Sequence, residues 1–173
     1  YTPETMTLDS SNVDFMIEEG LWKGFNLYQL YKSAYTPYEW HKDLFQFAEK
    51  IGITIFSSPF DETAVDLLEQ LNTPAYKIAS FELTDIPLIE YAASKKKPML
   101  ISTGLGNTKE IQEAICACKN QGNNKILLFH CISSYPANVS DYQIGDITYI
   151  RNTFKVEVGL SDHTLDNISS IIA

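Results

Sequence analysis

The sequence predicts an α/β fold with a parallel sheet, and more specifically part of a (β/α)8 TIM barrel. Five apolar runs recur every 20 to 30 residues or so, with helical patterns between them. Strands that are apolar nearly throughout are buried on both faces, and helical crossovers join parallel strands. Each run ends in a small polar residue, and polar groups after every strand favour a barrel over an open doubly wound sheet. These residues are Ser58, Ser80, Ser102, Ser133 and Ser161.

The individual elements follow from local signals. Residues 1–36 have an irregular pattern and predict a long loop with one short helix. The first regular helix is bounded by Pro37 at its first position and Gly52 after its last turn. The predicted strands are 53–59, 75–82, 98–104, 125–133 and 155–161. The predicted helices are 36–52, 61–72, 86–96, 107–122 and 141–154, with another beginning at 164.

The length of the chain limits how much of a barrel it can form. A complete (β/α)8 barrel takes about 250 residues, whereas this chain has 173 and about five predicted parallel strands. We therefore expect residues 1–173 to be part of one TIM-barrel catalytic domain, an incomplete piece that lacks the first strands and the last strand.

Composition excludes several classes of function. A net charge of −9 argues against nucleic acid and against an anionic membrane surface as partners. No apolar stretch reaches the roughly 20 residues that span a bilayer. The three cysteines, an odd number without a CxxC pair, suggest reduced thiols. We expect a cytoplasmic protein whose cysteines act as small core residues.

Two residues within the strand pattern carry chemistry. Lys77 lies inside a predicted strand, where a charge is costly unless it is paired or functional. It is either half of a buried salt bridge, a binder of phosphate or carboxylate, or a Schiff-base amine. His163 follows the last strand and is either an ordinary polar residue or a metal ligand or acid–base group. For His41 and His130 we favour structural roles.

Strict alternation along 75–82 separates its side chains into two sets. It predicts Lys77, Ala79 and Phe81 on one face of the sheet. It predicts Ile78, Ser80 and Glu82 on the other face.

Six segments together resemble the sialic acid synthase family of phosphoenolpyruvate-condensing enzymes. In chain order they read YTPETMTL, FSSPFD, PAYKIASFE, PMLISTG, CISSYPA and GLSDHTLDN, and they span almost the whole sequence. Two stretches, GLWKGFNLYQLYKSAYTPYEWH and ASFELTDIPLI, are most similar to the branch that makes pseudaminic acid. The branches that make N-acetylneuraminate or legionaminate remain alternatives.

The resemblance implies a transferase of nonulosonic acid biosynthesis, whose products decorate bacterial surface glycans. Its reaction would condense phosphoenolpyruvate with an amino-sugar aldehyde, 2,4-diacetamido-2,4,6-trideoxy-altrose, to give pseudaminic acid and phosphate. The family requires a divalent metal, Mn²⁺ or Mg²⁺. The resemblance also implies a homodimer in the intact protein and a C-terminal antifreeze-like domain that this chain lacks.

The resemblance also implies roles for individual residues. Lys77 would bind phosphoenolpyruvate and, with Glu82, form the catalytic pair. Five hydroxyl groups would assist in binding the substrate: Ser58, Ser80, Ser102, Ser133 and Ser161. Tyr135 would line the sugar site and His163 would be a metal ligand. Sialic acid synthases carry an asparagine at the position of Ser133, so this chain departs from the family pattern there.

Two rival functions stay open from the residues themselves. One is a Schiff-base aldolase that uses the amine of Lys77. The other is a phosphoanion-binding piece without turnover.

Overall fold

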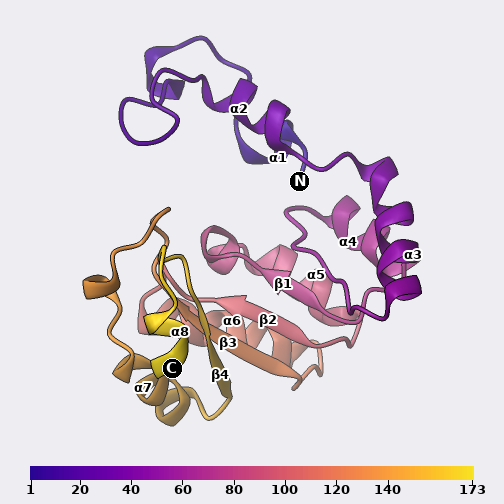
Figure 1. The fold of residues 1–173 in the computed structure, drawn as a ribbon. Coiled ribbons are helices and arrows are strands. Elements are labelled where there is room, and N and C mark those ends of the chain that lie inside the picture. Colours follow the sequence, from indigo (N-terminus) through magenta and orange to yellow (C-terminus); the bar gives the residue numbers. More distant parts are fainter. The chain divides into compact units, whose positions relative to one another are not determined.

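The computed structural model describes residues 1–173, which form two compact units (Figure 1). Unit 1 contains Tyr1–Ile55 and Pro59–Asn72. Unit 2 contains Phe56–Ser58 and Thr73–Ala173, and it holds the whole sheet. No helix is long and apolar enough to cross a bilayer.

Unit 1 is helical. It contains α1 (Pro3–Met6), α2 (Leu27–Ala34), α3 (His41–Ile51) and α4 (Glu62–Gln70), with 3-10 turns at Val13–Phe15 and Tyr38–Trp40. Residues 1–36 thus form two helices and a 3-10 turn, where the sequence predicted one short helix. A contact between α1 and α2, the bond from the Tyr28 hydroxyl to the Glu4 carboxylate at 2.6 Å, joins residues too distant for a local pattern to reveal.

The predicted helix ends in unit 1 are largely confirmed. Gly52 follows α3 with φ +74°, a left-handed conformation that glycine adopts without a steric penalty. The Asp61 carboxylate accepts the backbone N–H of Ala64 at 2.8 Å and so caps α4. The helix predicted from Pro37 instead begins as the 3-10 turn and becomes α-helical at His41.

Unit 2 is built on a parallel sheet, which confirms the predicted fold class. Its strands are β1 (Tyr76–Ile78), β2 (Met99–Ser102), β3 (Ile126–Cys131) and β4 (Glu157–Ser161), in the order β1-β2-β3-β4. The helices are α5 (Ile86–Ser94), α6 (Thr108–Asn120), α7 (Gly145–Phe154) and α8 (Ile168–Ile172), with 3-10 turns at Ser80–Thr84 and Val139–Asp141.

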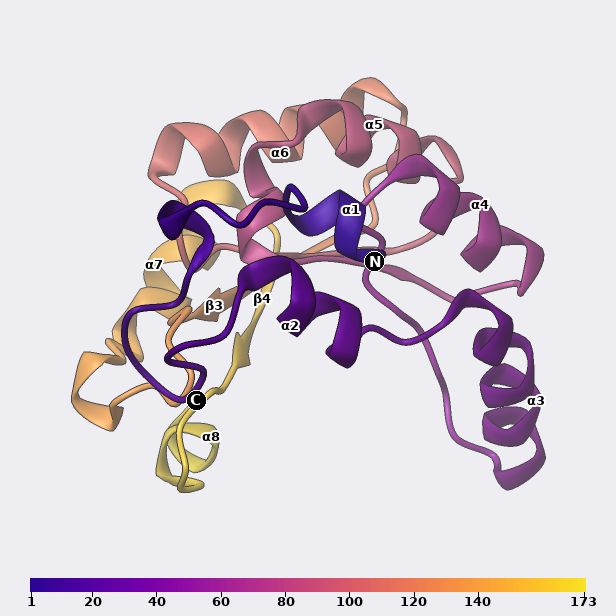
Figure 2. The ribbon, with the colours of Figure 1, turned by 90° about the horizontal axis from the view of Figure 1, so that it is seen from above.

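Helices cover one face of this sheet. Helices α5 and α6 pack side by side, and α7 contacts β3 and β4 (Figures 1 and 2). The strand residues beneath them are buried, and burying each such side chain contributes about 1.5–3 kcal/mol. The fully buried ones include Tyr76, Ile78, Met99, Ile101 and Leu128. Alternate residues point to the opposite face, which carries the candidate site.

The first predicted strand, 53–59, is not a strand. Only Ser57 pairs with the sheet, through an isolated parallel bridge to Tyr76. A strand needs successive backbone pairs as well as apolar side chains, and Pro59 has no N–H to donate. Ile53 is 60% exposed and Phe56 is 44% exposed. The sheet therefore has four strands, whereas the five apolar runs predicted five.

Candidate functional site

Strand register brings predicted site residues to one face of the sheet. Lys77 on β1 pairs with Leu100, and Ser102 follows two residues later on the same face of β2. Cys131 and Ser161, the last residues of β3 and β4, are register partners on that face. Because parallel strands end at one edge, Lys77, Ser102, Cys131 and Ser161 come from four strands to a common surface.

Lys77 is the cation of this surface. Its Nζ donates hydrogen bonds to Ser102 Oγ at 2.5 Å and to the Ile78 carbonyl at 3.3 Å. It also lies 5.7 Å from the centre of the Phe129 ring. Burial lowers the pKa of Lys77, and Cys131 and Glu82 oppose that shift. The ammonium is therefore held by hydroxyl, carbonyl and aromatic groups. It forms no direct ion pair, so the salt-bridge interpretation of Lys77 is not supported.

Ser80 lies directly beside Cys131. Its Oγ is 3.1 Å from Cys131 Sγ and accepts the Gly104 N–H at 3.2 Å. A Cβ on Gly104 would lie 2.6 Å from both Cys131 Sγ and Ser133 Oγ, so only glycine allows this approach. We call Lys77, Ser80, Ser102 and Cys131 the lysine group.

Cys131 and Gly104 were missed as site residues by sequence reasoning. Cys131 is buried, as a core residue would be, yet its thiol contacts a predicted substrate-binding hydroxyl. The signal was available, because Cys131 is two residues before Ser133 in the same predicted strand, and alternation would place both on one face. Gly104 had no such signal, since its close contacts join distant segments of the chain.

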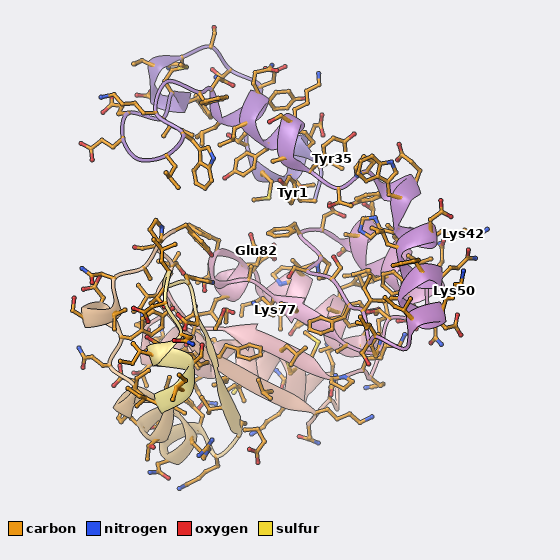
Figure 3. The ribbon with its side chains drawn as sticks, in the orientation of Figure 1. Tyr1, Tyr35, Lys42, Lys50, Lys77 and Glu82 are labelled. Atoms are coloured by element: carbon orange, nitrogen blue, oxygen red, sulfur yellow. The ribbon has the colours of Figure 1, made fainter.

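Glu82 lies in the 3-10 turn Ser80–Thr84, not on a strand. The predicted alternation beyond Ile78 is therefore wrong, because the backbone leaves the extended conformation there. Glu82 Oε2 is buried and has no hydrogen-bond partner. Burial raises the pKa of the Glu82 carboxyl, and the charge of Lys77 opposes this only weakly. Figure 3 labels Glu82 and Lys77, both in unit 2.

Ser58 and Ser133 are placed differently from the other predicted serines. Ser58 follows the isolated bridge at Ser57, whose carbonyl accepts the Lys77 N–H at 3.4 Å. Its hydroxyl makes no hydrogen bond to the lysine group. Ser133 Oγ is buried and has no partner, so its donor and acceptor capacity is unused.

A second cluster forms where β3 and β4 end. His163 Nδ1 lies 2.7 Å from the Ile132 carbonyl, and Nε2 lies 3.3 Å from Ser161 Oγ. The Tyr135 ring lies 4.4 Å from the imidazole, centre to centre. The hydroxyl of Tyr142, a residue that sequence reasoning did not select, bonds to the backbone of His163 and Ser161. We call Tyr135, Tyr142, Ser161 and His163 the histidine group.

The imidazole of His163 fits the predicted role of a metal ligand. A carbonyl accepts only from a protonated nitrogen, so Nδ1 carries a hydrogen; in the neutral imidazole, Nε2 then carries the lone pair. Metal-binding histidines commonly use this arrangement, with the second nitrogen bonded to a backbone carbonyl. The chain gathers no group of three or more His, Cys, Asp or Glu side chains that could hold a metal ion. Within this chain the residue that fits is His163.

The chain is similar in sequence to proteins of known function. The chain is 46% identical to pseudaminic acid synthase of Helicobacter pylori and 40% identical to that of Campylobacter jejuni, in both cases over all 173 residues. It spans about half the length of these relatives, 51% and 50% respectively.

A solved structure shares the fold. N-acetylneuraminic acid synthetase of Leptospira borgpetersenii, in complex with citrate, superimposes with a TM-score of 0.80 at 27% identity. The match covers 84% of this chain and 51% of that one. The family model described as the NeuB family matches residues 1–173. With its parallel sheet and its relatives over the full length, the chain belongs to the NeuB family.

Proposed function

We propose that the intact protein condenses phosphoenolpyruvate with 2,4-diacetamido-2,4,6-trideoxy-altrose to form pseudaminic acid and phosphate. The observation that carries the proposal is Lys77, whose Nζ bonds to Ser102 Oγ at the carboxyl edge of a parallel sheet. Two relatives that match the whole chain are named pseudaminic acid synthases, which favours this sugar acid over N-acetylneuraminate or legionaminate.

The lysine group suits a small dianion or trianion. Phosphoenolpyruvate carries a phosphate and a carboxylate, and one ammonium with several hydroxyl and amide donors can neutralise both. The donors of the lysine group are Lys77 Nζ and the hydroxyls of Ser80 and Ser102. The hydroxyl of Ser133 lies beside the group, next to Gly104 and Cys131. Such a site needs no basic surface, which agrees with a chain of net charge −9.

The proposed reaction forms one carbon–carbon bond and breaks one carbon–oxygen bond. The methylene carbon of phosphoenolpyruvate attacks the aldehyde carbon of the sugar, and the aldehyde oxygen takes up a proton. The former enol carbon becomes an oxocarbenium, and water adds to it and releases a proton. The tetrahedral intermediate then breaks the bond between that carbon and the bridging oxygen, and phosphate leaves with the oxygen. The hydroxyl gained from water becomes the ketone carbonyl, and its proton passes to the departing phosphate.

Glu82 is our candidate for moving the proton of the added water. A buried carboxyl with a raised pKa exchanges protons more readily near neutral pH than an exposed one. Its unpartnered Oε2 is free to accept that proton. Lys77 and the serine hydroxyls hold the phosphate and carboxylate in place during these steps.

His163 would hold the divalent cation through Nε2. When bound, Mn²⁺ or Mg²⁺ supplies Lewis acidity that polarises the sugar aldehyde. Tyr135, which lies against the His163 ring, would line the sugar side of the site.

The Schiff-base alternative also has an observation in its favour. Burial lowers the pKa of Lys77, as an amine nucleophile requires. Against it, Nζ donates to two oxygen atoms, which stabilises the ammonium. Borohydride added with phosphoenolpyruvate or pyruvate decides between them, because only an imine leaves a covalent adduct on Lys77.

The main test gives the intact protein phosphoenolpyruvate with ¹⁸O at the bridging position, together with each candidate amino sugar. We expect pseudaminic acid from the altrose derivative, with the label in the released phosphate. Product from another sugar only would assign the protein to a different branch. Label left in the sugar acid would reject the carbon–oxygen cleavage, and no turnover with any sugar would leave the phosphoanion-binding interpretation.

A further inference from the structure

The hydroxyl of Tyr142 is bonded to three backbone groups at once. It donates to the Ser161 carbonyl at 2.9 Å and accepts the N–H groups of His163 at 3.0 Å and Ile132 at 3.4 Å. A phenolic oxygen has one hydrogen and two lone pairs, so this set uses its whole capacity. The side chain is 8% exposed, so water does not compete for these bonds.

These three backbone groups belong to the ends of two strands. Ile132 follows the last residue of β3, and Ser161 is the last residue of β4. The carbonyl of Ile132 also accepts the hydrogen bond from His163 Nδ1 at 2.7 Å. Tyr142 therefore holds the main chain of His163, and it also holds the residue that orients the imidazole ring.

We propose that Tyr142 is a positioning residue that fixes the ring orientation and the tautomer of His163, and so sets the affinity of Nε2 for a divalent cation. The part that concerns the cation rests on the proposed function. The part that concerns the tautomer rests on the hydrogen bonds alone.

The competing explanation is that Tyr142 only fills space. Its ring packs edge-on against His130, with centroids 5.8 Å apart and planes at 86°. Phenylalanine keeps that ring contact and loses only the hydroxyl. The Tyr142→Phe substitution therefore separates the two explanations.

The experiment compares the intact protein with its Tyr142→Phe variant by ¹⁵N spectra of the histidine side chains, the His163 signal being assigned with a His163→Gln variant. We expect one tautomer in the unmodified protein, with hydrogen on Nδ1. In Tyr142→Phe we expect a mixture of tautomers and a Mn²⁺ affinity roughly tenfold weaker, at the lower end of losses for residues that orient metal ligands. The affinity for phosphoenolpyruvate without metal should stay unchanged.

The matched control is Tyr149→Phe, because Tyr149 is an exposed tyrosine on α7. It should leave the His163 spectrum and the Mn²⁺ affinity unchanged. An unaltered His163 spectrum and unaltered Mn²⁺ affinity in Tyr142→Phe would overturn the proposal. A failed condensation assay alone would overturn the proposed function and leave the tautomer result standing.

A measurement on the unmodified protein covers the case in which Tyr142→Phe does not fold. The N–H groups of Ile132 and His163 should exchange slowly with solvent, since both donate to the buried hydroxyl. Rapid exchange at both amides would contradict the hydrogen bonds on which the proposal depends.

Discussion

The lysine group and the histidine group hold their functional side chains in different ways. Lys77 is held by side chains and a carbonyl, with Ser102 Oγ as its nearest oxygen. The His163 imidazole contacts the Ile132 carbonyl and Ser161 Oγ, and the hydroxyl of Tyr142 ties together the main chain of His163, Ile132 and Ser161. A substitution in the lysine group thus alters the partners of the Lys77 ammonium directly, whereas one at Tyr142 alters the main-chain frame that supports the His163 imidazole.

This difference matters because the two groups are proposed to bind different things. Hydroxyls and an ammonium can rotate to follow an anion as its geometry changes during the reaction. A metal ligand must keep one nitrogen lone pair in a fixed direction. Main-chain support provides that direction more rigidly than a rotatable side chain does.

The largest effect is expected for Glu82, the carboxyl proposed to move a proton in the chemical step. Glu82→Gln should lower turnover by a factor of about 10² to 10⁴, the usual contribution of a general acid or base, and leave phosphoenolpyruvate affinity near normal. The measurement is steady-state turnover with a separate binding titration. Glu113→Gln, an exposed position on α6, is the control. Near-normal turnover in Glu82→Gln would remove Glu82 from the mechanism.

Replacing Lys77 should alter the lysine group and leave the histidine group unchanged. Lys77→Met should weaken phosphoenolpyruvate binding by roughly 10- to 100-fold, since a hydrogen bond to a charged group contributes about 1.5–3 kcal/mol. Lys77→Arg should recover part of this loss. The ¹⁵N signal of His163 should not change in either variant. If it did change with Lys77→Met, the lysine group and the histidine group would be coupled and would not act independently.

The close approach at Gly104 tests the packing beneath the lysine group. Gly104→Ala places a Cβ 2.6 Å from Cys131 Sγ and should cost about 1–3 kcal/mol of unfolding free energy, as overpacking does. Gly145→Ala is the control, because a Cβ there meets nothing within 4 Å. Urea denaturation measures both. Equal stability of the two variants would mean that β3 shifts at Cys131 to accept the added methyl group at little cost in free energy.

The smallest effect concerns pH. The pKa of Glu82 is raised by burial, so above about pH 4.5 the folded chain binds a proton that the unfolded chain has released. Stability should therefore fall as pH rises from the unfolded pKa through the folded one. Glu82→Gln should remove this decline and stabilise the fold at neutral pH by less than about 1 kcal/mol, since solvent reaches the partly buried carboxyl. Urea midpoints at several pH values measure it, and parallel profiles for the two proteins would contradict it.

Much of the fold was predictable because local signals and global structure agree. The helices predicted from 61 and 107 begin there, because Asp61 and Asn107 cap them and a capping side chain needs only neighbouring residues. The parallel sheet followed from apolar runs separated by helical patterns. The run 53–59 failed because forming a strand depends on a paired neighbour, and sequence period alone does not supply one.

The candidate site was predictable only in part. Lys77 and His163 stood out because a charge in a buried strand and a histidine at a strand end are unusual. Their roles, phosphoenolpyruvate binding for Lys77 and metal ligation for His163, stay predictions. Tyr142 and Gly104 could not be found in this way, since their importance depends on contacts with distant residues. Glu82 was selected by resemblance, but its place in a turn was not foreseen.

The strand order also bears on how the protein is made. Each strand pairs with the strand that precedes it in the chain, so the sheet can grow as the chain leaves the ribosome. The lysine group is complete once Cys131 has emerged, and His163 follows about 30 residues later. At roughly 5–20 residues per second, this leaves a delay of roughly two to six seconds. During synthesis the anion-binding side therefore has time to form before the histidine that would complete the site exists.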